Sequence, residues 1–198
     1  MAEITATLVK ELREKTGAGM MDCKNALKDA EGDMDKAVEI LRKKGIARAS
    51  KKADRAVNEG RIEAYIHPGS KLGVLVEINC ETDFVAKTDD FLTFTRDVAM
   101  QIAASAPLFV KREDVDQATI DSEMEIYRAQ AKDQGKPDNI IDRIAAGKLD
   151  KFYSEICLME QPFVKDPDKT IENLLTETIA KLGENISIRR FTRFKVGE

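Results

Sequence analysis

Few side chains in this sequence have the types and spacing that catalysis needs, and most of them lie near residues 77–87, EINCETDFVAK. Cys80 could act as a nucleophile only beside a base, and the one histidine, His67, is expected near the turn of the same hairpin. Glu81 and Asp83 follow in polar, turn-like surroundings that offer no means of tuning them for acid–base catalysis. The residues therefore predict no catalytic group, and they favour a Cys80 that packs in the core.

Asp83 and Phe84 are a less ordinary pair, because an apolar aromatic residue directly follows a carboxylate where a strand is expected to end. In one interpretation, Phe84 turns back into the protein's own core. In the other, Phe84 is exposed and inserts into a pocket of a second protein, while Asp83 meets the polar rim of that pocket. The residues alone leave both interpretations open.

Metal and cofactor chemistry has little support in the sequence. The three cysteines, Cys23, Cys80 and Cys157, lie far apart with no CxxC, and one histidine is too few for a His-rich zinc site. We therefore predict no metal and no cofactor. Separated cysteines in odd number are typical of a reducing compartment. No apolar run approaches the roughly 20 residues of a membrane helix, and the N-terminus lacks a secretion-signal pattern, so we expect a cytoplasmic protein without a membrane partner.

The N-terminal part is predicted to form three short helices. Apolar residues recur every four positions over residues 4–12, stop at Gly17-Ala18-Gly19 and resume over residues 20–30. Gly32-Asp33 interrupts the pattern again before a third amphipathic stripe over residues 34–41. We interpret the Gly-x-Gly as a turn between helices, because it follows a helical pattern and has no Lys-Ser/Thr of a phosphate-binding loop beside it.

An uneven charge distribution marks a boundary after these helices. Residues 1–56 hold 13 Lys and Arg against 10 Asp and Glu, whereas residues 57–198 hold 19 against 26. Basic residues dominate the segment 42–55, which indicates a solvated helix or linker; a nucleic-acid-binding patch is the alternative. We predict a first domain of residues 1–55 and a second domain of residues 56–198.

Beyond this boundary the sequence predicts an α+β core. Twofold alternation on either side of Pro68-Gly69 predicts a hairpin, and the same alternation over residues 186–196 predicts a final strand. Helical spacing is found over residues 89–106, 117–134, 138–146 and 170–182, with a further apolar stripe over 149–156. The predicted fold class is α+β: a three-helix module, a small antiparallel sheet, packed helices, and a helical hairpin at about residues 117–157.

Four longer motifs carry a resemblance to a known family. They are LVKELREKTGAGMMDCKNAL (8–27), EINCETDFVAK (77–87), QPFVKDPDKT (161–170) and KLGENISIRRF (181–191). In these motifs the chain resembles the elongation factor Ts family over essentially its whole length, and it is similar to the short form of that family. The resemblance implies that residues 1–55 are a ubiquitin-associated-like module and that the remainder is a core for exchange and dimerisation.

The resemblance also implies a function without bond chemistry, so the chain is not expected to be an enzyme. Members of the family exchange guanine nucleotide on elongation factor Tu during translation elongation. By resemblance, the stretch Thr82, Asp83, Phe84 and Val85 enters the GTPase domain of that partner beside its magnesium and phosphate site. Arg13, Met20 and Met21 would bind another part of the same domain, and His67 resembles a histidine that contacts the partner in longer members.

The short form is expected to self-associate into a homodimer and to form a 2:2 complex with elongation factor Tu. The alternating strand over residues 186–196 and the helical hairpin are the candidate dimer surfaces. No direct contact with nucleic acid is expected. Two other classes of function remain as alternatives: a basic-helix nucleic-acid-binding module associated with the ribosome, and a thiol enzyme centred on Cys80 or Cys157.

Overall fold

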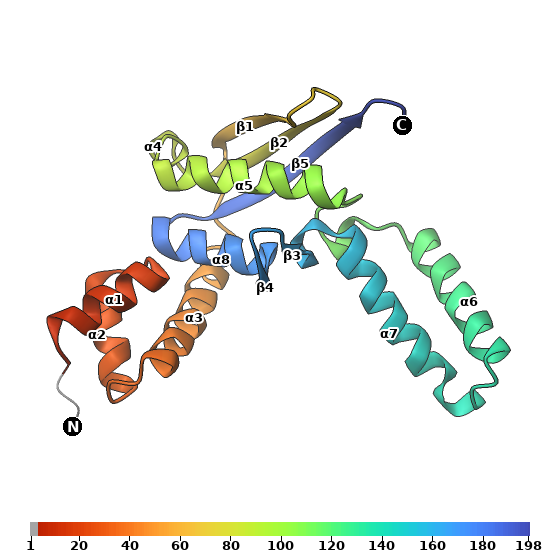
Figure 1. Cartoon of the computed structure of the whole chain (residues 1–198), viewed down its shortest axis with the longest axis horizontal. Helices are drawn as coiled ribbons and strands as arrows, with labels where there is room; N and C mark the ends of the chain where they lie inside the picture. The colour runs from red at the N-terminus through yellow and green to blue at the C-terminus, as the bar shows by residue number, and fades with distance from the viewer. Residues whose placement is uncertain (1–3) are drawn as a thin grey trace. The chain divides into compact units, whose positions relative to one another are not determined.

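The computed structural model describes residues 4–198, which form both helices and short sheets (Figure 1). The helices are α1 (Ala6–Thr16), α2 (Met20–Asp29), α3 (Met34–Ser50), α4 (Asp83–Ala86), α5 (Asp89–Ser105), α6 (Gln117–Asp133), α7 (Asp138–Ile156) and α8 (Ile171–Leu182). The strands are β1 (Glu59–Ile66), β2 (Leu72–Cys80), β3 (Pro162–Phe163), β4 (Asp166–Thr170) and β5 (Ile186–Lys195). Helices together with a small antiparallel sheet fit the predicted α+β class.

The contacts between residues divide the chain into two compact units. Within the described residues, the first unit consists of residues 4–61, Ile78–Thr95 and Asn173–Ser187. The second unit consists of Ile62–Glu77, Arg96–Glu172 and Ile188–Glu198. The long strands β1, β2 and β5 contribute residues to both units. The domain boundary between residues 55 and 56 stays a prediction.

The first unit contains the three N-terminal helices, and residues with special backbone roles set their ends. Thr5 caps α1 by accepting a hydrogen bond from the Leu8 amide, and Gly17 ends it in a left-handed conformation with φ 66°. Asp33 caps α3 by accepting from the Lys36 amide at 3.0 Å. The helices enclose a core of Val9, Leu12, Cys23, Ala26, Leu27, Ala30 and Ala37. The predicted three helices and their two interruptions are confirmed; the similarity to a ubiquitin-associated module stays a prediction.

Helix α3 is longer than the predicted apolar stripe, because its second half packs on α8. Gly45 is buried, and a Cβ atom added there would lie 3.5 Å from the Cβ of Ala180. Arg42 donates a hydrogen bond of 2.7 Å to the Asn173 side chain. The basic segment therefore begins as a packed helix that runs to Ser50.

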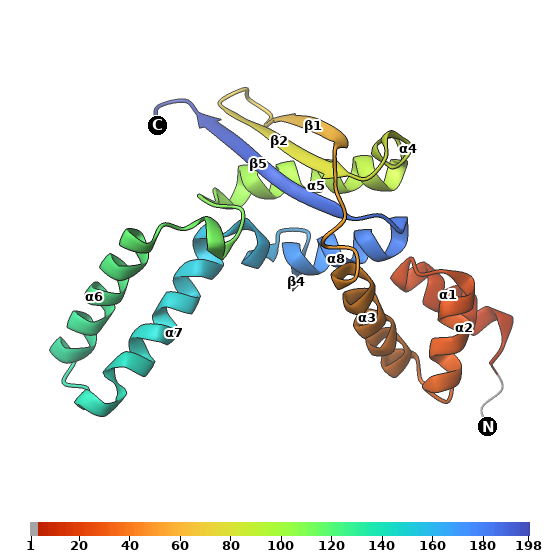
Figure 2. The same ribbon diagram turned by 180° about the vertical axis from the view of Figure 1, so that it is seen from behind.

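The three-stranded sheet has the order β1-β2-β5 (Figure 2). β1 and β2 form the predicted hairpin, which closes where the Ser70 amide donates to the His67 carbonyl at 2.9 Å. Gly69 supplies the positive φ of 94° that this turn requires. Ile62 and Ile66 of β1 are exposed, so the apolar members of its alternation point away from the core. In β5 the alternation of more and less buried residues is interrupted at Arg189 and Arg190, which are two consecutive exposed residues.

Helices α6 and α7 of the second unit form the predicted helical hairpin and lie side by side in both views (Figures 1 and 2). The sequence predicts a helix over residues 138–146 and a separate apolar stripe over 149–156. That break is wrong, since α7 runs through Gly147 without interruption to Ile156. A glycine in a helix costs only about 1 kcal/mol relative to alanine. The apolar stripe that continues through Leu149 and Tyr153 packs with Val115, which keeps the chain helical.

A buried pair of glutamines, Gln101 and Gln161, stabilises the short β3–β4 hairpin. Gln101 donates to the Gln161 side chain at 3.1 Å and accepts from the Val164 amide at 2.8 Å. Gln161 in turn donates to the Glu155 carbonyl at 2.7 Å. Buried amides need such partners, and here they connect α5, the end of α7 and β3 within the second unit.

Gly60 provides a test of the sheet's packing, because β1 passes very close to β2 there. Its φ is 145°, and an added Cβ would lie 2.3 Å from the Ile78 carbonyl oxygen and 2.6 Å from the Asn79 Cα. We expect Gly60→Ala to lower the free energy of unfolding by about 2–4 kcal/mol through overpacking and backbone strain, measured by urea denaturation. The control Gly147→Ala fills open space within α7 and should raise that free energy by about 0.5–1 kcal/mol. Equal stability of Gly60→Ala and the unaltered chain would contradict the packing described.

Candidate partner-binding site

Of the large apolar side chains that the structure describes, Phe84 is the most exposed, with 80% of its surface accessible. It lies in α4, a single helical turn that directly follows β2. The interpretation in which Phe84 packs in the protein's own core is therefore wrong, and the exposure required by the other interpretation is confirmed. Exposing a whole phenyl ring leaves its hydrophobic free energy available for binding.

Threonine side chains at both ends give the turn a defined shape. The Thr82 hydroxyl accepts from the Val85 amide at 3.4 Å, which caps α4. The Thr88 hydroxyl donates to the Val85 carbonyl at 2.8 Å and accepts from the Phe91 amide, so the same residue begins α5. Because Phe91 is fully buried, the far end of the turn is attached to the core. Phe84 is thus presented on a braced segment.

Asp83 forms an ion pair along the turn with Lys87, at 2.6 Å. The aspartate side chain is about half exposed, at 49%, and the lysine is more exposed, at 74%. The bond to Asp83 raises the pKa of Lys87. Asp83 and Phe84 therefore lie together at the surface, with the carboxylate held by a cation that water can also reach.

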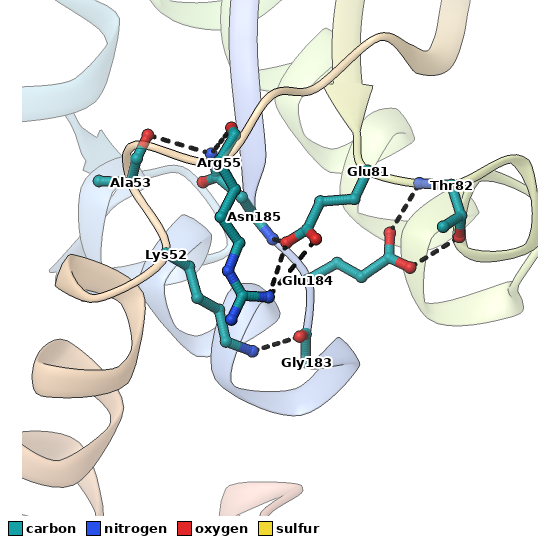
Figure 3. Close-up of polar contacts among 8 residues, drawn as sticks. All are labelled: Lys52, Ala53, Arg55, Glu81, Thr82, Gly183, Glu184 and Asn185. Carbon is teal, nitrogen blue, oxygen red and sulfur yellow. Dashed lines mark hydrogen bonds and ion pairs between the residues drawn. The ribbon is translucent and has the colours of Figure 1, made fainter.

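A group of polar residues from three parts of the first unit lies next to Thr82, at the start of this turn (Figure 3). Glu184 accepts two hydrogen bonds from Thr82, at 3.0 Å from the amide and 2.6 Å from the hydroxyl. The neighbouring Asn185 amide donates to Glu81 at 2.6 Å. This Asn185 bond, and then the nearby Arg55 guanidinium, lower the pKa of Glu81. Glu81 is thus an ionised bracing group and is unsuited to act as a general acid.

Asn185 extends the group to the chain that leaves α3. Its side-chain amide donates to the Ala53 carbonyl at 3.2 Å and to the Arg55 carbonyl at 2.9 Å. The Lys52 ammonium donates to the Gly183 carbonyl. The segment after the N-terminal helices and the segment before Phe84 are consequently attached to the same short connection between α8 and β5 (Figure 3).

Cys80 is buried, as predicted, and its thiol donates to the Thr82 carbonyl at 3.1 Å. Burial, and then the nearby Glu184 carboxylate, raise the pKa of Cys80 to about 11. Burial also raises the pKa of Cys157 to about 11. Reactive cysteines need the thiolate at neutral pH, so neither residue suits the thiol-enzyme alternative.

Arg13, Met20 and Met21 lie on the three-helix part of the first unit. Arg13 is exposed in the last turn of α1, and Met20 and Met21 begin α2 with 48% and 65% of their surfaces accessible. The turn from Gly17 to Gly19 brings these two helix ends next to each other in the chain. Flexible, exposed thioethers suit an adaptable protein contact. Their role stays a prediction.

His67 lies in the second unit at the exposed turn between β1 and β2. Its Nδ1 is 3.0 Å from the Tyr65 hydroxyl, which orients the ring. Among residues 4–198, no three His, Cys, Asp or Glu side chains lie together in a way that could hold a metal ion.

Most cations of the basic segment 42–55 have partners inside the first unit. Arg48 makes two bonds to Asp22, at 2.8 and 2.9 Å, which lower the pKa of that carboxyl. Lys44 pairs with Asp29 at 3.2 Å, and Arg55 with Glu81 at 3.4 Å. A nucleic-acid surface needs cations that are available to phosphate. The basic residues of this segment instead form ion pairs that attach α3 and the chain after it to α2 and to Glu81.

Sequence reasoning identified Asp83 and Phe84 but assigned no role to Glu184 or Asn185. Their motif, KLGENISIRRF, lies about a hundred residues from the turn, and nothing in its local pattern indicates the contact. The sequence held one signal for them. Gly183 ends α8 with a φ of 79°, and two side chains that can form hydrogen bonds, Glu184 and Asn185, follow it directly before an apolar strand.

Comparison with known proteins connects this arrangement to a family. Residues 3–198 match the sequence profile described as Elongation factor TS. The chain belongs to this family. Its elongation factor Ts relatives include that of Carboxydothermus hydrogenoformans, 64% identical over 98% of the chain and 90% of the relative, and that of Thermoanaerobacter sp., 61% identical over 98% and 96%. A third, from Geotalea daltonii, is 62% identical over 98% and 90%.

Membership of the elongation factor Ts family makes the chain a translation elongation factor of protein biosynthesis. In the described part of the chain, no helix is both long enough and apolar enough to cross a bilayer.

Thiol labelling tests how this elongation factor Ts protein uses its cysteines. At pH 8 a pKa raised from 9.0 to about 11 leaves Cys80 and Cys157 about 100-fold less thiolate than an unfolded chain has. We expect iodoacetamide to label both slowly in the native protein and rapidly in guanidinium. The protonated thiols favour folding below pH 9, so the free energy of unfolding should fall as the pH rises from 9 towards 11. Fast native labelling of Cys80 would instead support the thiol-enzyme alternative.

Proposed function

We propose that this chain is the guanine-nucleotide exchange factor of elongation factor Tu, and that it promotes GDP release by inserting Phe84 near the magnesium and phosphate site of the GTPase domain. The observation that carries the proposal is Phe84, 80% exposed on a turn braced at both ends. Membership of the elongation factor Ts family supports the choice of partner. The factor itself makes and breaks no covalent bond, and it acts in the cytoplasm.

Exchange requires the factor and GDP to weaken each other's binding to the GTPase by the same ratio. GDP is held by backbone donors around its phosphates and by magnesium, so a small displacement of that region breaks several charge-assisted bonds together. Burying one phenylalanine side chain is worth about 1.5–3 kcal/mol. Phe84 can therefore provide part of the distortion, and other contacts must provide the rest.

Asp83 is proposed to meet the polar rim of the pocket that Phe84 enters. It is paired with Lys87 in the free factor, and an ion pair this exposed contributes little to stability. Giving up this pair for a contact on the partner thus costs little. The arrangement keeps the carboxylate beside the ring until the partner binds.

Arg13, Met20 and Met21 are proposed to supply the additional contacts to the GTPase domain from a ubiquitin-associated-like module of residues 1–55, which precedes a core of residues 56–198. The exposure of the two methionines supports this assignment, because each offers apolar surface for burial. His67, exposed at its turn, is proposed as a further contact.

We also propose that two copies associate through the outward side of the sheet in the second unit, giving a 2:2 complex. Ile66, Leu75, Phe194 and Val196 line a shallow hollow of about 470 Å³. All four are exposed, together with Ile62 on the same side of β1. We call these five residues the apolar strip. Exposed apolar patches of this kind mark interaction sites, and a twofold axis would place the strip of one copy against that of the other.

The exchange proposal is tested by Phe84→Ala in assays of labelled GDP release from elongation factor Tu. Removing the ring should slow stimulated release by about 10-fold or more, because most of its burial energy is lost. The matched control is Leu108→Ala, which truncates another apolar residue with 68% exposure outside the proposed surfaces and should change the rate by less than about twofold. Wild-type rates with Phe84→Ala would remove the ring from the mechanism.

The dimer proposal is tested by sedimentation velocity at micromolar concentrations. Phe194→Asp places a charge in the apolar strip and should convert the dimer to a monomer, since an unpaired buried charge is strongly unfavourable. Ile126→Asp, on the exposed side of α6, serves as the comparison and should leave the dimer intact. Dissociation by Ile126→Asp alone would assign the interface to the helical hairpin, and a monomeric wild-type chain would contradict the dimer.

A further inference from the structure

We infer that Glu184 is a positioning residue for nucleotide exchange: its carboxylate presets the turn that carries Phe84. This inference rests on the proposed function. It concerns a residue outside the Thr82–Val85 stretch, on the connection between α8 and β5.

The contact is directed at the residue that starts the turn. Glu184 accepts from the Thr82 amide through one carboxylate oxygen, at 3.0 Å, and from the Thr82 hydroxyl through the other, at 2.6 Å. The same hydroxyl oxygen accepts from the Val85 amide at 3.4 Å. One carboxylate therefore orients the hydroxyl that caps α4, and the cap orients the backbone on both sides of Phe84.

Asn185 adds a second constraint beside the first. Its backbone amide donates a hydrogen bond of 2.6 Å to the side chain of Glu81, the residue before Thr82. Two consecutive residues, Glu184 and Asn185, therefore bind two consecutive residues, Thr82 and Glu81 (Figure 3). Glu81 also lies 3.4 Å from the Arg55 guanidinium, and the Asn185 side chain holds the Ala53 and Arg55 carbonyls. The chain leaving the N-terminal helices and the chain entering the turn thus share one support.

This support has a consequence for binding. A turn that fluctuated in the free factor would lose conformational entropy when Phe84 entered its pocket, which weakens binding. Hydrogen bonds to a charged acceptor restrict Thr82 before the partner arrives. Removing Glu184 should leave the ring and its hydrophobic energy in place but lower the fraction of molecules in which the turn is correctly shaped.

The chain offers a closely matched control. Asp116 accepts from the Thr119 amide at 2.9 Å and from the Thr119 hydroxyl at 2.8 Å, at the start of α6 in the second unit. Asp116→Ala removes the same pair of bonds from a place without a role in the proposal. Glu184→Gln is the conservative variant, because its amide can still accept from the Thr82 N–H and donate to the hydroxyl.

The test compares Glu184→Ala, Glu184→Gln, Asp116→Ala and Phe84→Ala, with the double variant Phe84→Ala/Glu184→Ala, in GDP release from elongation factor Tu. We expect Glu184→Ala to raise the factor concentration for half-maximal stimulation about 5- to 10-fold, Glu184→Gln to restore most of this loss, and Asp116→Ala to have no effect. In the Phe84→Ala background, Glu184→Ala should raise that concentration by less than about twofold, because the ring that Glu184 positions is absent. Amide hydrogen exchange at Val85 should accelerate in free Glu184→Ala and not in Asp116→Ala.

The outcomes separate the inference from the function on which it rests. The inference is wrong if Phe84→Ala slows GDP release but Glu184→Ala stimulates it as well as the wild type does. It is also wrong if the losses of the two single variants multiply in full in the double variant, because Glu184 then does not act through Phe84. Unchanged hydrogen exchange at Val85 in Glu184→Ala overturns it as well. If the wild-type chain fails to release GDP, the proposed function fails first, and the positioning role fails with it.

Discussion

Two hydrogen bonds between Thr82 and the Glu184 carboxylate join parts of the chain that are 102 residues apart. The arrangement of the candidate site depends on this contact and on the adjacent bond from Asn185 to Glu81. They bring together the end of β2, the end of α8 and the segment after α3, which have no reason to meet from their own local preferences. Because the acceptors are carboxylates, the bonds are stronger than bonds between neutral groups.

The hydrogen bonds made by Glu184 and Asn185 give a physical reason for the exposure of Phe84. A ring that is 80% accessible gives up burial energy in the free protein, and that energy becomes available to a complex. The gain is greatest when the backbone is already in its bound shape, since ordering a mobile segment opposes binding. The braced turn from Thr82 to Thr88 meets this condition. Arg48 and Lys44 form ion pairs with acidic residues of α2, so these basic side chains stabilise the first unit.

The sheet shows the same division between internal structure and surface available for association. β2 turns Val74, Val76 and Ile78 inward, where they are almost completely buried. Ile62 and Ile66 of β1 point the other way, although their alternation is as regular as that of β2. Twofold periodicity identifies two faces of a strand, but the covering of each face decides which one is core. In the second unit, apolar residues on the uncovered face provide the basis for the proposed association.

Local chemistry in the sequence determined where most elements begin and end. Thr5 and Asp33 cap helices, Gly17 and Gly183 end them in left-handed conformations, and Pro68-Gly69 closes the hairpin, because each acts on backbone within a few residues. The motif around Phe84 was likewise recognisable from its residues. Only the tertiary structure decided that Phe84 is outside the core, that α7 continues through Gly147, and that Glu184 supports the turn. Those outcomes depend on which surfaces and hydrogen-bonding groups meet across long stretches of chain, and a local pattern carries no information about its distant partner.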